Sequence, residues 1–180
     1  MRWTTLVGTA LLATLASTAS AQDISYDYDK SADFSRFKTY AWVPGHNLPD
    51  ELNNQRIVSA IDRQLAAKGL RRVDANASPD VLVAYHALFD KDVEIRGFSS
   101  GWAGYRFGAH RSGTARVEEV VVGTLAVDVI DARTRTIVWR GMATKDVDVK
   151  ADPEKRDKNI NKAAEKLFKH YPPKNSGNKA

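Results

Sequence analysis

The sequence RVEEVVVGTLAVDVIDARTRTIVWR, residues 116–140, decides the fold of this chain. Apolar and polar residues alternate in its first part, so Leu125 and Val127 share one face of a strand, and Thr124 and Asp128 lie on the other. This alternation predicts one long strand over 116–131.

A second strand follows after a short turn. The turn residues Asp131-Ala132-Arg133-Thr134 separate the long strand from the apolar run Ile137-Val138-Trp139-Arg140, and the second arm continues through Val149. Turn residues between two such runs predict an antiparallel hairpin with Asp131 at the turn.

Further strands are predicted before this hairpin. The run from Val81 to Asp90 is apolar on both faces at first, which is typical of a central strand. Short strands are expected over 24–29 and 38–43, paired as a hairpin around Ser31-Ala32-Asp33, and another is expected over 70–73.

Two amphipathic helices accompany the strands. The first runs from Asp50 to Lys68, and Gly69 is expected to end it in the left-handed conformation. The second begins after Asp152, an N-cap followed by proline at the first helical position, and ends before Pro172-Pro173. The order of elements predicts an α+β fold of two layers: a mostly antiparallel twisted sheet with both helices packed on one face.

The first 21 residues match a secretory signal. A basic Arg2 precedes an apolar run from Leu6 to Leu15, and Ala19-Ser20-Ala21 supplies the small residues that signal peptidase accepts, so cleavage is expected after Ala21. A membrane anchor needs about 20 apolar residues, more than this run contains. The sequence therefore predicts a signal peptide at 1–21, one α+β domain over 22–173, a disordered tail at 174–180, and a soluble periplasmic location.

Composition excludes several classes of protein. The 43% hydrophobic and 9% aromatic content is that of a globular domain rather than a disordered chain. No cysteine is present, which excludes disulfides and the cysteine that carries a bacterial lipid anchor. The formal charge of +5 comes from scattered basic residues mixed with acids, so nucleic acid is not an expected partner.

Several short pieces, taken in order, resemble a bacterial envelope family known as domain of unknown function number 4136. The pieces are Tyr26-Asp27-Tyr28-Asp29, Lys38-Thr39-Tyr40-Ala41-Trp42, Leu65-Ala66-Ala67-Lys68-Gly69-Leu70, Pro79-Asp80, Gly123-Thr124-Leu125, Val138-Trp139-Arg140-Gly141 and Tyr171-Pro172-Pro173. Many members are lipoproteins, so the resemblance implies an envelope protein, but it brings no established catalytic residues. This chain departs from those members because it lacks the lipid-bearing cysteine.

No residue pattern predicts a catalytic or metal site, and no cofactor is expected. The four histidines, His46, His86, His110 and His170, are too far apart for the short ligand spacings of common metal sites. No serine lies in a Gly-x-Ser-x-Gly or Ser-x-x-Lys arrangement, and cysteine is absent. The acids of the hairpin, such as Asp146 and Asp148, are interpreted as solubilising strand charges.

The stretch 97–113 is the predicted ligand-binding segment, because it combines glycines with aromatic rings and arginines. Flat rings and cationic donors suit sugars, peptides or lipid interfaces. The candidate residues are Phe98, Trp102, Tyr105, Arg106, Phe107 and Arg111. The alternative is a long hairpin connection whose aromatic residues cover the sheet.

These features favour a non-enzymatic periplasmic binding or assembly module that contacts a protein or an envelope polymer. One alternative is a hydrolase acting on envelope material, which needs a convergent acid pair or a histidine-centred site in a cleft. A pocket that places Asp128 or Glu118 near His86 would favour it. Another is a structural envelope protein without a ligand. The oligomeric state is not predicted.

Overall fold

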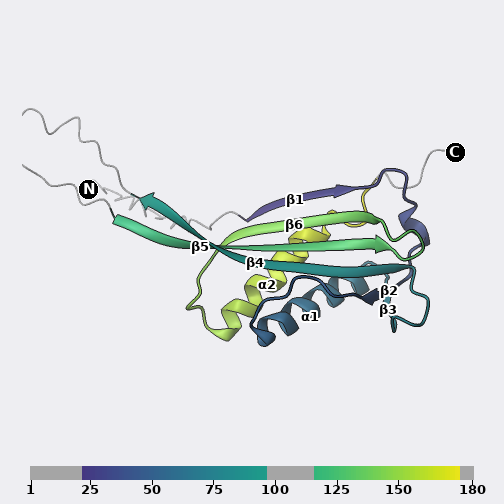
Figure 1. Ribbon diagram of the computed structural model, residues 1–180, viewed down its shortest axis with the longest axis horizontal. Helices are drawn as coiled ribbons and strands as arrows, with labels where there is room; N and C mark the ends of the chain where they lie inside the picture. Colours follow the sequence, from purple (N-terminus) through teal and green to yellow (C-terminus); the bar gives the residue numbers. More distant parts are fainter. Residues whose placement is uncertain (1–21, 97–115, 175–180) are drawn as a thin grey trace, which may run out of the picture.

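The computed structural model describes residues 22–96 and 116–174, which form one six-stranded sheet and two helices on the same face of it (Figure 1). The strand order is β1-β6-β5-β4-β2-β3. The elements are β1 (Asp23–Tyr28), the 3-10 helix η1 (Phe34–Arg36), β2 (Thr39–Trp42), α1 (Glu51–Ala67), β3 (Arg71–Arg72), β4 (Val81–Arg96), β5 (Arg116–Asp131), β6 (Ile137–Val147) and α2 (Pro153–Phe168). The predicted α+β class and the two-layer arrangement are confirmed.

The long hairpin of β5 and β6 has the predicted antiparallel pairing, with Val127 opposite Gly141 and Asp128 opposite Arg140. At the turn, the Asp131 carboxylate accepts hydrogen bonds from the backbone N–H groups of Arg133 (2.9 Å) and Thr134 (3.3 Å). An aspartate that bonds the backbone two residues on is a common turn device, and it accounts for the position of the reversal.

β4 is longer than predicted, because it pairs with β5 as far as Arg96 opposite Arg116. The pairing of β5 with β6 ends earlier, at Val121 opposite Val147. The distal parts of β4 and β5 therefore extend past the neighbouring strands as a two-stranded ribbon (Figure 1). Residues 97–115, which join them and include the predicted ligand-binding segment 97–113, lie outside the described residues.

The predicted N-terminal hairpin is wrong. β1 pairs antiparallel with β6 at one edge of the sheet, whereas β2 pairs in parallel with β3 and β4 near the other edge. The connection between them buries Phe34 and Phe37, which pack edge to face at 5.7 Å, and Phe34 also packs on Tyr171. A connection that contributes two rings to the core is part of the packing and not a tight hairpin turn.

Both helices begin with the predicted caps and α1 ends before the predicted glycine, whereas α2 ends at Phe168, before Pro172-Pro173. The Asp50 carboxylate caps α1 by accepting from the Asn53 N–H at 3.1 Å, and the Asp152 carboxylate caps α2 by accepting from the Lys155 N–H at 2.7 Å. Gly69 follows α1 with a φ of 85°, the left-handed conformation that glycine adopts without strain.

The core lies between the sheet and the helices and is centred on Trp139. Its indole packs against Phe168 and Tyr171, with ring centroids 5.5 and 5.3 Å apart, and all three side chains are fully buried. Gly141 makes room for that indole, because a Cβ there would lie 2.4 Å from the ring. Neither helix in the described part of the chain has the length and apolar character needed to cross a membrane.

Candidate ligand pocket

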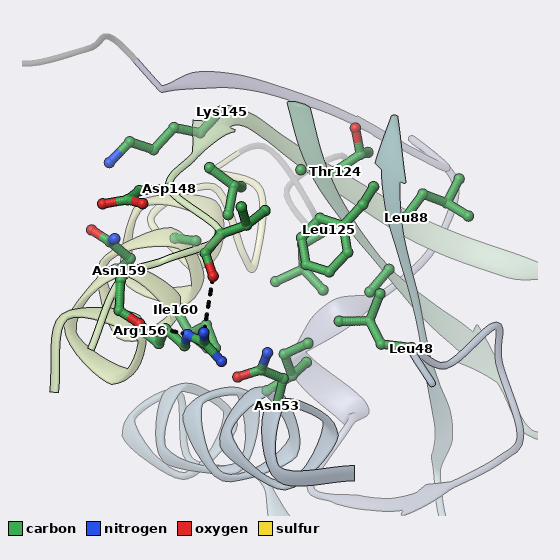
Figure 2. A pocket seen from close by; sticks show the side chains of 18 of the residues that line it. Leu48, Asn53, Leu88, Thr124, Leu125, Lys145, Asp148, Arg156, Asn159 and Ile160 are labelled. Carbon is green, nitrogen blue, oxygen red and sulfur yellow. Dashed lines mark hydrogen bonds between the residues drawn. The ribbon is translucent and has the colours of Figure 1, made fainter. Parts of the chain in front are cut away.

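A pocket of about 370 Å³ lies between the two helices and the helix-facing side of the sheet (Figure 2). Ala87 and Phe89 come from β4, and Gly123 and Leu125 come from β5. Asn53 and Ile57 of α1 face Ile160 and Ala163 of α2 across the same space. The size is within the range typical of small-molecule sites.

Two small residues, Ala87 and Gly123, shape the sheet side of this pocket. Ala87 lies opposite Leu125, and the next pair on the same face is Phe89 opposite Gly123. A Cβ at Gly123 would lie 2.5 Å from a Val147 methyl and 3.3 Å from the Phe89 ring, so the missing side chain lets these two walls converge. Phe89 is 48% exposed although its strand position faces the helices, which leaves an apolar ring uncovered at the pocket.

Arg156 is a polar group of the lining that is held by several contacts. Its guanidinium donates to the carbonyl oxygens of Ala151 (2.9 Å) and Val149 (3.0 Å), and it lies 4.0 Å from the Asp50 carboxylate. Figure 2 shows Arg156 beside Ile160, on the α2 side of the pocket. These contacts fasten the start of α2 to the segment after β6.

Asp148 is engaged in a surface ion pair at the pocket margin. Its carboxylate lies 2.9 Å from the Lys155 ammonium and also accepts from the Lys150 backbone N–H at 3.0 Å. The hydrogen bond from Lys155, followed by that of Lys150, lowers the pKa of Asp148 below its ordinary value. Asp148 is therefore ionised and paired at neutral pH.

On the opposite face of the sheet, the structure brings His86 and Asp128 together. His86 Nε2 lies 3.3 Å from an Asp128 oxygen, and the Arg140 guanidinium binds both oxygens of that carboxylate at 2.5 and 2.7 Å. His86 Nδ1 accepts a hydrogen bond from the His46 backbone N–H at 3.2 Å. Both imidazole nitrogens thus have a partner within this chain.

A hydrolase site is expected to place an acid near His86 in a pocket, and the structure meets this only in part. The His86–Asp128 contact exists, but neither residue lines the pocket. Glu118 pairs in register with Glu94 in the distal ribbon. The contact between His86 and His46 was not predicted, since forty residues separate them and a parallel bridge joins them.

The remaining candidates lie apart from the pocket or beyond the described residues. The His170 ring stacks on Tyr26 at 4.4 Å. Over residues 22–96 and 116–174, no group of acids and histidines is arranged to hold a metal ion. His110 and the six predicted ligand residues, Phe98, Trp102, Tyr105, Arg106, Phe107 and Arg111, fall outside the described residues, so their role stays a prediction.

The model of the family described as Domain of unknown function (DUF4136) matches residues 24–173. The chain belongs to this family. The resemblance inferred from the sequence is confirmed, and no curated protein matches the chain.

Solved structures share the fold at low sequence identity. A DUF4136 family protein from Bacteroides thetaiotaomicron has 14% identity and a TM-score of 0.52, and covers 84% of this chain and 96% of that one. A variant PelC dodecamer from Paraburkholderia phytofirmans has 9% identity and a TM-score of 0.51, covering 82% and 95%. A PDZ domain protein from Parabacteroides distasonis has 17% identity and a TM-score of 0.52, covering 86% of this chain. The match spans only 37% of that protein. At these identities the likeness establishes the fold alone.

Proposed function

We propose that this protein is a non-enzymatic binding module of the bacterial periplasm and that its pocket holds a small apolar ligand. The pocket carries the proposal: most of its walls are apolar, and it lies where two helices and three strands meet. The apolar lining residues are Leu48, Ile57, Ala87, Leu88, Phe89, Leu125, Val147, Val149, Ala151, Ile160 and Ala163. Binding sites of this kind combine an apolar interior with a few polar groups at the margin.

Two features of the sequence support the location. The signal predicted at 1–21 directs the chain out of the cytoplasm, and the family resemblance points to the envelope. The aromatic segment 97–113 follows the distal end of β4, so it is a second candidate contact for an envelope protein or polymer.

The binding proposal is tested with a neutral apolar fluorophore, N-phenyl-1-naphthylamine, titrated into the full exported chain. Ala163→Phe places a ring in the pocket and should weaken saturable binding about tenfold or more, which corresponds to ~1.4 kcal/mol. The control is Ala67→Phe, which adds the same ring at the exposed end of α1 and should leave binding unchanged.

Thermal unfolding of each variant checks that the fold is intact. Equal binding by folded wild type and folded Ala163→Phe would contradict the pocket as the site. No saturable binding by the wild type would contradict the proposed function.

A further inference from the structure

Lys145 is a cationic residue of the pocket lining that lies outside the ion pairs formed by the other charged lining residues. It lies on β6 directly opposite Gly123, on the helix-facing side, and its side chain is partly buried. Figure 2 shows it along the same margin of the pocket as Asp148 and Asn159, across from Leu48 and Leu88. A lysine in this position can lay its methylene stem along the apolar wall and present its ammonium at the margin.

The other charges of the lining are already engaged. Asp148 pairs with Lys155, and Asp50 accepts from the backbone and side-chain nitrogens of Asn53. Arg156 donates to two carbonyl oxygens and approaches Asp50. Asp146, the next residue on β6, faces the other side of the strand by alternation and has interactions of its own. In the described part of the chain, the Lys145 ammonium takes part neither in the Lys155–Asp148 ion pair nor in the Arg156–Asp50 contact.

The interior behind Lys145 favours a chain of limited length. A volume of about 370 Å³ has room for about a dozen atoms of the size of a water molecule. Leu125 and Val147 from the sheet and Ile57 and Ile160 from the helices supply apolar surface on both sides. Water held against such surface is released when an apolar chain replaces it.

We propose that the pocket binds a short single-chain amphiphile whose apolar chain enters the pocket and whose anionic head group, a carboxylate or a phosphate, pairs with the Lys145 ammonium. A charge-assisted hydrogen bond to an anion is about twice as strong as a neutral one, so Lys145 selects for anionic head groups. This inference rests on the proposed function, because it names the ligand class of the same pocket.

The test is a calorimetric titration of the full exported chain with decanoate and decyl phosphate below their micelle concentrations, and with decanol below its solubility limit. These three probes share one chain and differ in the head group. Wild type should bind at least one of the two anions about tenfold more tightly than decanol. The anion that binds more tightly distinguishes a carboxylate from a phosphate ligand.

Lys145→Met removes the charge while keeping an unbranched apolar stem. It should weaken binding of the preferred anion about tenfold and leave decanol binding within about twofold. Lys158→Met, the same change at an exposed position of α2, should leave all three affinities unchanged. For wild type, raising the salt concentration should reduce the preference for the anion, which is a readout independent of any variant.

The outcomes separate the two proposals. Two results would overturn the role of Lys145 while keeping a binding pocket. One is equal affinity of wild type for decanol and both anions, and the other is an equal loss of affinity for all three probes in folded Lys145→Met. If wild type binds the fluorophore but none of the three chains, the amphiphile proposal fails and the binding pocket stands. If it binds neither the fluorophore nor any of the chains, the proposed function itself fails.

Discussion

At the scale of the residue, a few carboxylates hold segments that are distant in sequence. Asp80 is the clearest case, because its Oδ2 accepts from the backbone N–H groups of Lys38 (2.9 Å) and Thr39 (2.8 Å). The same oxygen accepts from the Thr39 hydroxyl at 2.8 Å. These bonds tie the start of β2 to the start of β4, a parallel strand pair that no local turn joins.

Asp80→Ala should lower the free energy of unfolding by about 1–3 kcal/mol at pH 7, because backbone donors lose their acceptor. The Lys38 N–H is the largest cause that lowers the pKa of Asp80 below its ordinary value of 3.8. A lowered pKa means that this stabilisation is complete above pH 3.8 and is lost as the pH falls through the pKa of the folded state.

Urea unfolding at pH 7 and at acid pH measures both effects. The variant should show a smaller loss of stability than wild type below about pH 4. Asp74→Ala, at an exposed position, is the control. It should change neither the free energy of unfolding at pH 7 nor the loss of stability at acid pH. An Asp80→Ala protein as stable as wild type at pH 7 would show that these bonds contribute nothing.

At the scale of the element, α2 contributes fully buried side chains to the core. Leu167 and Phe168 are fully buried, and Phe168 packs directly on Trp139 of β6. Fully burying one such side chain contributes about 1.5–3 kcal/mol relative to leaving it exposed. The sheet therefore depends on α2 to cover its central tryptophan.

A chain that ends at Lys150 should consequently lose cooperative unfolding, because removal of α2 exposes the apolar face of the sheet. A chain that ends at Lys174 keeps α2, Tyr171 and Pro173 and serves as the control; it should unfold like the full-length protein. Circular dichroism during urea titration measures how cooperatively each of the two chains unfolds. A sharp transition near the wild-type midpoint in the shorter chain would mean that the sheet is stable without α2.

At the scale of the whole molecule, the topology depends on the connection from β1 to β2. The chain passes from one edge of the sheet to near the other, and the buried Phe34 lies against Tyr28, Phe37 and Tyr171 on the way. This aromatic cluster joins the N-terminal strand, the connection and the end of the chain in one packed group.

Phe34→Ala should destabilise the protein by about 3–5 kcal/mol, because it leaves a cavity in that cluster. Lys30→Ala, in the same connection but exposed, should be close to neutral. Urea unfolding with an unchanged m-value measures the difference. A loss below about 1 kcal/mol would mean that the connection contributes little to the packing.

The sequence alone determined the family, both helices with their caps, the β5–β6 hairpin and the two-layer class. These follow from periodicity, capping residues and turn chemistry, which act over a few residues. It did not predict the partners of β1 and β2, the pocket around Gly123, or the contact of His86 with Asp128. Only the tertiary structure decided these, because strand partners and cavities depend on how segments far apart in the chain bury their apolar surface together.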